Sequence, residues 1–243
     1  MRYIKKFIRW TLALFFSSTI MAVVLYRFMP VYITPLMVIR SVQQLKDGKS
    51  ITLHHHWIPL QEMSKHLPVA AMAGEDAHFL EHHGFSYDAI KKAAEQNAKR
   101  NKISHGGSTI SQQTAKNVFL WPSRTWFRKG LEAYFTVLIE LIWSKQRIME
   151  VYLNSIEMGN GIYGADAVAE YHFNKTAADL TRSECALIVA TLPNPRIYSS
   201  KAPSAYTRMR QRRIEREMTF IPSFPKEGEA IDPKTIQGNG YKK

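Results

Sequence analysis

Residues 131–152, LEAYFTVLIELIWSKQRIMEVY, carry the strongest structural pattern in the chain. Large apolar side chains recur in this stretch at intervals of three and four residues, which places them on one face of an α-helix. The residues of this stripe are Leu131, Tyr134, Phe135, Leu138, Leu141, Ile142, Ile148, Met149 and Tyr152. The spacing predicts one long helix or a pair of helices that pack against a core through this face.

Helical patterns also continue toward the C-terminus. Residues 183–192 (SECALIVATL) are nearly all apolar and are followed by Pro193, which ends a helix. Residues 206–218 are a candidate for a basic helix, and from Ile221 onward Pro, Gly and Lys occur without periodicity, which predicts a frayed tail. Only residues 50–54 show a weak strand-like alternation. We therefore expect a mainly α fold with one domain.

The N-terminus contains an uncharged apolar run, residues 10–26 (WTLALFFSSTIMAVVLY), which neighbouring apolar residues extend to residue 29. This length suits a transmembrane helix, since about 20 apolar residues cross a bilayer. Bulky residues continue past Ser17 and Ser18, which favours a retained anchor over the alternative of a cleaved signal peptide. Basic residues precede the run and favour a cytoplasmic N-terminus; they are Arg2, Lys5, Lys6 and Arg9.

Composition narrows the classes of partner. The 33 Lys and Arg against 20 Asp and Glu give a net charge of +13, which favours an anionic partner. An exported domain makes nucleic acid an unlikely ligand, so we expect an extracytoplasmic lipid or polymer instead. The lone cysteine, Cys185, excludes an intramolecular disulfide and any zinc site with two or four cysteines.

The first polar segment is residues 69–84, VAAMAGEDAHFLEHHG. A run of small apolar residues delivers Glu75 and Asp76, followed by Phe79 and His82. Partial burial at the end of an apolar helix raises the pKa of a carboxyl group and suits it to general base or acid catalysis. The alternative is that Glu75 and Asp76 are ordinary surface residues near the end of a helix. Residues 78–82 also fit the H-x-x-E-H pattern of some zinc peptidases, which we attribute to chance among nine histidines.

The second polar segment is residues 106–120, GGSTISQQTAKNVFL. Ser108 or Thr109 can cap the helix that follows, and Thr109 and Gln112 have the spacing of a capping box. The start of that helix favours anions, so the segment suits either a diphosphate and sugar hydroxyls or a purely structural cap. Its polar face consists of Ser108, Thr109, Gln112, Gln113, Lys116 and Asn117.

The third polar segment is residues 128–133, RKGLEA. Arg128 and Lys129 stand four and three residues before Glu132, so all three share one helix face. Two cations favour the ionised carboxylate, which suits Glu132 to an electrostatic role, to orienting a lysine or to binding a metal. An ordinary surface ion pair is the alternative.

Together these segments resemble the peptidoglycan glycosyltransferase family, whose members polymerise the glycan strand from lipid II. The resemblance rests on E-D-x-x-F-x-x-H-x-G at 75–84, G-x-S-T-I-x-Q-Q-x-x-K-N at 106–117, R-K-x-x-E-A at 128–133 and R-I-x-x-x-Y-L-N-x-x-x-x-G at 147–159, with a further block at 180–198. The chain leaves no length for a transpeptidase domain, so it is most similar to the monofunctional members.

The resemblance implies a lysozyme-like helical domain with a small membrane-associated jaw lobe. It implies that the 4-hydroxyl of lipid II attacks C1 of a lipid-linked strand in one inverting displacement, with Glu75 as the general base and Glu132 as the second carboxylate. A divalent cation, Mg²⁺ or Mn²⁺, near Glu132 is an open expectation, and no organic cofactor is expected. The implied substrate-binding residues are Asp76, Phe79, His82, Ser108, Thr109, Gln112, Gln113, Lys116, Asn117, Arg128 and Lys129.

These expectations give a division of the chain and a location. We expect an inner-membrane protein with one span and an extracytoplasmic (periplasmic) catalytic domain, in contact with lipid II, the growing strand and membrane lipids, with cell-wall synthesis or division proteins as further candidate partners. The alternatives are a lytic transglycosylase and an inactive precursor-binding scaffold. The expected parts are a basic tail (1–9), a transmembrane helix (10–29), a juxtamembrane connector (30–49), the glycosyltransferase domain (50–218) and a C-terminal tail (219–243).

Aromatic and basic residues between the second and third segments are typical of a membrane interface. Trp121, Trp126 and Phe127 lie close to Arg124 and Arg128 in the sequence. We expect this stretch to enter the outer leaflet, and the alternative is that both tryptophans pack into the small lobe.

Overall fold

The computed structural model describes residues 2–87, 91, 107–226 and 228–229, and this part of the chain is mainly helical, as expected. A small three-stranded sheet has the order β1-β3-β2, in which β3 pairs parallel with β1 and antiparallel with β2. The helices are α1 (Arg2–Phe28), α2 (Pro35–Lys46), α3 (His66–Glu75), α5 (Ile110–Phe119), α6 (Trp126–Ile142), α7 (Lys145–Ser155), α8 (Ala165–Val168), α9 (Arg182–Thr191) and α10 (Ala205–Glu217). The shorter elements are η1 (Leu60–Glu62), η2 (Ala169–Phe173), η3 (Ala177–Asp179), β1 (His54–His55), β2 (Glu157–Gly159) and β3 (Ile162–Tyr163).

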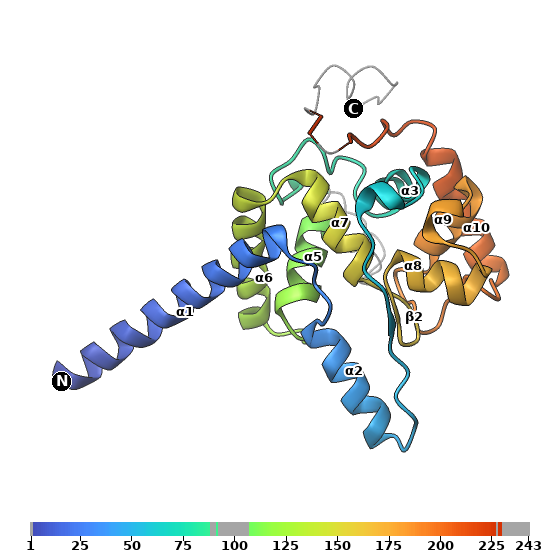
Figure 1. Cartoon of the computed structure of the whole chain (residues 1–243). Coiled ribbons are helices and arrows are strands. Elements are labelled where there is room, and N and C mark those ends of the chain that lie inside the picture. Colours follow the sequence, from blue (N-terminus) through green and yellow to red (C-terminus); the bar gives the residue numbers. More distant parts are fainter. Residues whose placement is uncertain (1, 88–90, 92–106, 227, 230–243) are drawn as a thin grey trace.

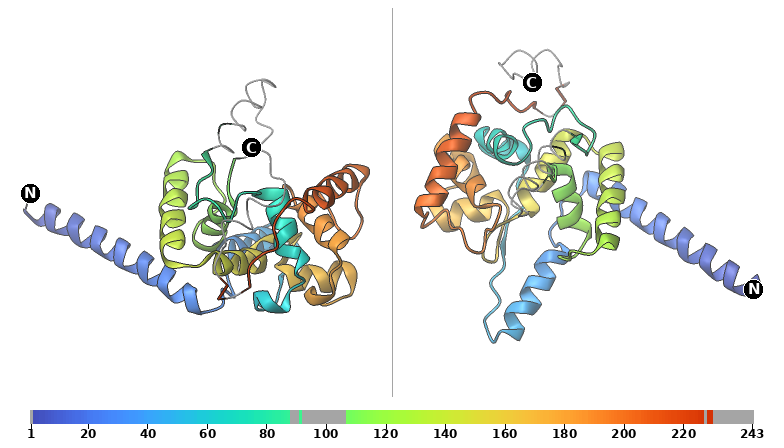
Figure 2. Two further views of the ribbon diagram at one scale, coloured as in Figure 1. Left: turned by 90° about the horizontal axis from the view of Figure 1, so that it is seen from above. Right: turned by 180° about the vertical axis from the view of Figure 1, so that it is seen from behind.

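The helices form two packed groups (Figures 1 and 2). In one group α3 packs against α9 and α10, and in the other α5 packs against α6 and α7. The core runs between the groups and contains the fully buried side chains of Tyr152, Ile148 and Leu153 from α7. This arrangement places the C-terminal end of α3 beside α5, which brings the first two polar segments together.

The apolar stripe at residues 131–152 forms a helix pair rather than one helix. Helix α6 ends at Ile142, and α7 begins at Lys145 after the cap residue Ser144, whose side chain accepts a hydrogen bond from the backbone N–H of Arg147. A serine at this position satisfies one of the free N–H groups of the new helix. The helices expected near residues 183–192 and 206–218 are confirmed as α9 and α10.

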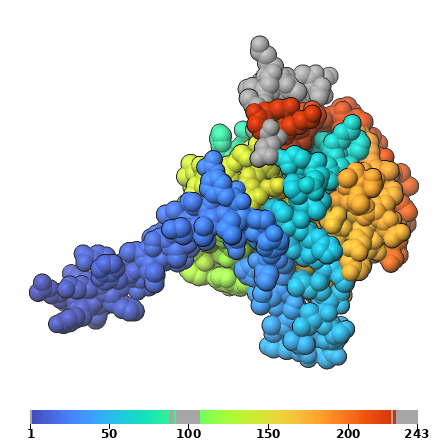
Figure 3. Space-filling view, viewed as in Figure 1, coloured from blue at the N-terminus to red at the C-terminus, as the bar shows by residue number. Residues whose placement is uncertain are grey.

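Helix α1 is long and apolar enough to cross a membrane, the one such helix among the described residues. It projects from the body of the molecule (Figure 3), but its C-terminal end is docked onto the domain. The indole Nε1 of Trp143 donates to the carbonyl of Val23 at 2.7 Å, and Arg147 donates to the carbonyl of Tyr26 at 2.8 Å. The carbonyl of Tyr26 would normally accept from residue 30, but Pro30 has no N–H, so Arg147 supplies the missing donor.

Three sequence expectations need correction. The expected connector (30–49) contains a helix, α2, which begins at Pro35 and is capped by Thr34. Strands β2 and β3 were not predicted, since they are too short and too buried to alternate. The tail does not fray at Ile221, which is buried, and Phe224 packs against the core; residues 230–243 lie outside the described part.

Candidate active site

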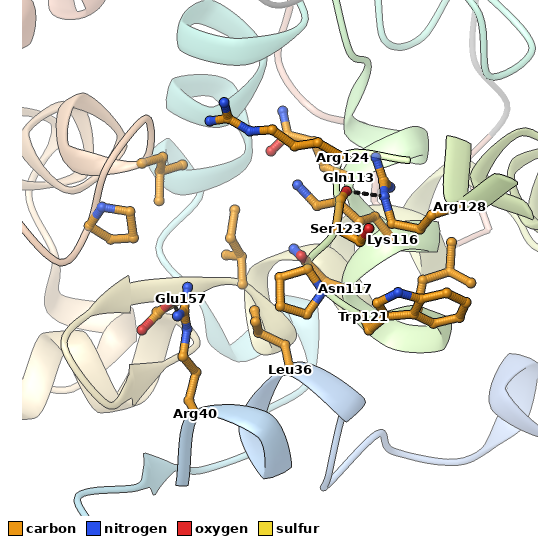
Figure 4. A pocket seen from close by; sticks show the side chains of 15 residues that line it. Leu36, Arg40, Gln113, Lys116, Asn117, Trp121, Ser123, Arg124, Arg128 and Glu157 are labelled. Atoms are coloured by element: carbon orange, nitrogen blue, oxygen red, sulfur yellow. Dashed lines mark hydrogen bonds and ion pairs between the residues drawn. The ribbon is translucent and has the colours of Figure 1, made fainter. Parts of the chain in front are cut away.

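A cavity of about 500 Å³ lies between α2, α5, the start of α6, β2 and the end of α9 (Figure 4). Apolar side chains such as Leu36 and Trp121 form part of its wall. The other part is polar and contains four cations and one carboxylate, and this excess of positive charge points to an anionic ligand. The polar and charged lining residues are Arg40, Gln113, Lys116, Asn117, Ser123, Arg124, Arg128 and Glu157.

Glu75 lies at the last position of α3, behind the cavity wall that Gln113 forms. The Nε2 of Gln113 donates to its carboxylate at 2.9 Å, and the buried hydroxyl of Tyr152 donates to the Oε1 of Gln113 at 3.3 Å. Burial raises the pKa of Glu75, as expected, while the hydrogen bond from Gln113 and the charges of Arg210 and Lys116 oppose this rise. The result is a partly desolvated carboxyl group held in one position, which suits a general base.

Asp76 and His82 form a packed network beside Glu75. The carboxylate of Asp76 lies 2.9 Å from the Nε2 of His82 and accepts from the backbone N–H of Ile110 at 2.9 Å. The backbone N–H of Gly84 donates to the Nδ1 of His82, so the proton of a neutral ring is on Nε2 and points at Asp76. Phe79 is fully buried. These three expected substrate residues therefore lie behind the cavity and tie α3 to the start of α5.

Thr109 and Gln112 form the capping box of α5, as their spacing predicts. The side chain of Thr109 also donates to the carbonyl of Gly84 at 2.7 Å, and both residues are buried away from the cavity. Their hydrogen-bonding groups are engaged within the protein, so the structure places them in a cap rather than on a substrate-facing surface. Ser108 is half-buried just before the cap.

Lys116 and Asn117 do line the cavity. Burial lowers the pKa of Lys116, whereas the negative charge of Glu132 opposes this effect. Within the described part of the chain, the ammonium group of Lys116 makes no hydrogen bond or ion pair. A half-buried cation without a direct partner favours an anion that can reach it, so Lys116 points to an anionic group in the cavity.

Glu132 is buried under two cations, as its spacing predicts. Arg128 and Lys129 each form an ion pair with one of its carboxylate oxygens, and Arg128 also donates to the carbonyl of Ser123. Arg128 and the nearby Lys116 line one end of the cavity, and Glu132 and Lys129 pair with Arg128 behind this surface.

A divalent cation at Glu132 does not fit this donor set. Both carboxylate oxygens already accept from cations, and no cluster of three His, Cys, Asp or Glu side chains occurs among the described residues. Mg²⁺ needs several oxygen ligands. The requirement for such an ion stays a prediction, and no step below uses it.

Several residues at the site had not been predicted. Arg40 reaches the cavity from α2, Glu157 from β2 and Arg124 from the loop before α6. The positive charge of Arg210 in α10 opposes the rise in the pKa of Glu75, and the Nε of Arg210 donates to the carbonyl of Ala190 at 3.2 Å. Arg124 lies in the aromatic and basic stretch before α6 that the sequence marks. The packing of distant elements alone brings the other three to the site.

Known proteins are similar to this chain over most of its length. The family model described as transglycosylase matches residues 42–219. The chain belongs to the transglycosylase family. It is 60% identical over 235 residues to the biosynthetic peptidoglycan transglycosylase of Bacteroides thetaiotaomicron, covering 95% of this chain and 94% of that relative. Proteins of the same name in Bdellovibrio bacteriovorus (49% identity, 93% and 90% covered) and Caulobacter vibrioides (50%, 88% and 92%) are also similar.

Family membership agrees with the placement of the motif blocks. The matched range begins within α2 and ends just after α10, so it includes the whole cavity wall except Leu36 and Arg40. In the fourth block, Asn154 braces the fold: its side chain donates to the carbonyl of Ile58 at 2.9 Å and accepts from the same residue's N–H at 3.0 Å.

Proposed function

We propose that this protein is a membrane-anchored peptidoglycan glycosyltransferase that polymerises lipid II into β-1,4-linked glycan strands and releases polyprenyl diphosphate. Family membership and relatives named biosynthetic peptidoglycan transglycosylases support glycan polymerisation. The observation that carries the mechanism is the pairing of a partly buried carboxyl group, Glu75, with a cationic cavity next to it that contains Lys116 and Arg128.

In the proposed reaction Glu75 is the general base. The 4-hydroxyl oxygen of the acceptor sugar attacks C1 of the donor sugar, the proton of that hydroxyl passes to Glu75, and the bond from C1 to the diphosphate oxygen breaks. One displacement inverts the configuration at C1 and needs no covalent nucleophile. Because its pKa is raised, Glu75 is a stronger base than an exposed carboxylate while it remains ionised.

The cations at the other side of Gln113 stabilise the leaving group. The diphosphate gains negative charge as the bond breaks, and fixed cations that surround it lower the barrier. Lys116, which has no direct anionic partner among the described residues, and Arg128 face the cavity, while Lys129 completes the group. In this proposal Glu132 does not act as an acid: it holds Arg128 and Lys129 in place.

The anchor places this chemistry at the membrane surface. We infer that α1 crosses the cell membrane with its basic N-terminus in the cytoplasm and the domain outside. The docking of Trp143 and Arg147 on the end of α1 supports a fixed position of the cavity relative to the bilayer, where a lipid-linked substrate lies.

Purified full-length protein in detergent, incubated with lipid II, tests the proposal. We expect long glycan strands, and we expect Glu75→Gln to reduce their rate of formation about 10²-fold or more, because the proton acceptor is lost while the shape is kept. A lytic transglycosylase would shorten preformed glycan instead, and an inactive scaffold would bind lipid II without turnover; either result would contradict the proposal.

A further inference from the structure

The cavity has a second polar end, opposite the cations around Glu132. Glu157 of β2 and Arg40 of α2 face each other there (Figure 4), and both line the cavity. Glu157 is 7% exposed, and burial raises its pKa, with the charges of Arg40 and Arg196 acting in the opposite direction. A nearly buried carboxyl group on a cavity wall is costly unless the protein or a ligand compensates it.

Arg40 and Glu157 compensate each other only in part. The Nε of Arg40 lies 3.6 Å from the Oε2 of Glu157, which is an ion-pair distance but too long for a hydrogen bond. That Nε is buried and has no hydrogen-bond partner within the described residues. The hydroxyl of Tyr163 is likewise buried and unpartnered there, and burial together with the negative charge of Glu157 raises its pKa. The Nη1 of Arg40 donates to the side chain of Gln43 at 2.8 Å, and a backbone hydrogen bond from Gly161 also stabilises the Glu157 carboxylate. This end of the cavity therefore has an arginine whose other guanidinium donors have no hydrogen-bond partner among the described residues, beside a carboxylate acceptor.

The charges at this end select the kind of group that fits. A cation at this end meets Arg40 and the nearby Arg196, and an anion meets the carboxylate of Glu157 as well as the two arginines, so neither charge is matched by both sides. A neutral group that both donates and accepts hydrogen bonds satisfies both sides, because the carboxylate accepts an O–H or N–H and the guanidinium donates to an oxygen. Sugar hydroxyls and acetamido groups have this chemistry.

We propose that Arg40 and Glu157 bind the sugar portion of the lipid-linked substrate, through its hydroxyl or acetamido groups, while Lys116 and Arg128 at the opposite end bind its diphosphate. This inference rests on the proposed function and adds a division of the cavity into a sugar end and a diphosphate end. Arg40 comes from α2, directly after the anchor, so the segment that follows the membrane span contributes to recognition of the sugar.

Steady-state kinetics of the full-length protein separate the two ends. The probes are lipid II, which carries sugars and diphosphate, and undecaprenyl diphosphate, which carries no sugar and is measured as an inhibitor. We expect Glu157→Gln and Arg40→Gln each to raise the KM for lipid II about tenfold and to leave the inhibition constant of undecaprenyl diphosphate within twofold. Lys116→Ala should weaken both, because the diphosphate is common to both probes.

Controls make the outcomes distinct. Glu217→Gln makes the same change in an exposed carboxylate that pairs with Arg213 at 2.8 Å, and it should alter neither constant. Arg40→Lys keeps the charge but removes the guanidinium donors, and it should raise the KM for lipid II like Arg40→Gln. Unchanged KM values in both Gln variants, or equal weakening of both probes, would overturn the sugar end, whereas a wild-type protein that makes no polymer would overturn the proposed function itself.

Discussion

Glu75 shows how a single residue acquires a function from its surroundings. Its carboxyl group is desolvated, which raises its pKa, but the amide of Gln113 and two nearby cations stabilise the ionised form. The rise in pKa was predictable from the apolar run before Glu75. The partners were not, because Gln113 lies 38 positions away and Arg210 comes from the last helix.

A variant of Gln113 tests this balance through the pH profile. Gln113→Leu removes a hydrogen bond that favours the ionised carboxylate, so the pKa of Glu75 should rise further. A general base is active only when ionised, so the acid limb of kcat/KM for polymerisation should move to higher pH. Gln146→Leu, on the outer side of α7, serves as the control. If the acid limb of the Gln113 variant does not move, the general base is a group other than Glu75.

The same residue should cost the protein stability. Because the pKa of Glu75 is raised in the folded state, the folded protein binds more protons than the unfolded chain, and its stability falls as pH rises from the ordinary carboxyl range through the raised pKa. Glu75→Gln removes this penalty, so it should raise the melting temperature at pH 7 and have a smaller effect at pH 4. Thermal unfolding at both pH values measures the difference. A Gln variant that is less stable at pH 7 than at pH 4, relative to wild type, would contradict it.

At the scale of elements, a buried ion pair joins the two helix groups at the turn between α6 and α7. The ammonium of Lys145 donates to Glu140 at 2.8 Å and to the carbonyl of His82 at 2.6 Å, and it lies 4.5 Å from the centre of the Phe79 ring. Glu140 also accepts from the hydroxyl of Ser111 on α5. The pair therefore connects α6 and α7 to the loop after α3 and to the start of α5.

Removal of one member of this pair should be more harmful than removal of both. Lys145→Met leaves Glu140 buried without its cation, which should lower the free energy of unfolding by about 3–5 kcal/mol. Lys145→Met with Glu140→Leu removes both charges and should lower it by less. Urea unfolding of the three proteins measures these changes. A double variant at least as unstable as the single one would show that the pair is not the source of the effect.

The sequence predicted the longer helices better than the short elements. The stripe at residues 131–152 predicted helix over most of α6 and α7, because each helix buries one continuous face, but it left open whether the stretch is one helix or two. Helix α2 was missed since a proline is compatible with both the start of a helix and an interruption, and only the cap at Thr34 decides between them. Because α2 was not predicted, its residue Arg40 was not recognised as a candidate site residue, and one end of the cavity could not be predicted from local patterns.

At the scale of the whole molecule, the proposed membrane span α1 and helix α6 would together set the orientation of the domain toward the bilayer. Contacts between them run in the same direction: Thr19 with Tyr134, then Val23 with Trp143 at the end of α6. The first turn of α6, about 12 Å before Tyr134, therefore points toward the part of α1 that precedes Thr19, which is apolar from residue 10 onward. In that turn Trp126 is 91% exposed and Phe127 is 70% exposed, so the alternative that the Trp126 ring packs into the small lobe is wrong.

These exposed rings should enter the outer leaflet, where the lipid chain of the substrate lies. We expect a truncated protein that begins at residue 30, and so lacks α1, still to bind anionic vesicles, because two aromatic rings partition into the interface beside Arg124. Trp126→Ser with Phe127→Ser should weaken vesicle binding about tenfold or more in a sedimentation assay.

A matched control removes exposed apolar side chains elsewhere. Ile197 is 74% exposed and Tyr206 is 45% exposed, and both lie near α9 and α10, in the helix group that does not contain α6. Ile197→Ser with Tyr206→Ser should leave vesicle binding unchanged, because these side chains lie away from the face that α1 and α6 define. If the truncated protein ignores vesicles, or if both double variants bind equally well, α1 alone supplies the membrane contact, and the substrate must reach the cavity without help from the first turn of α6.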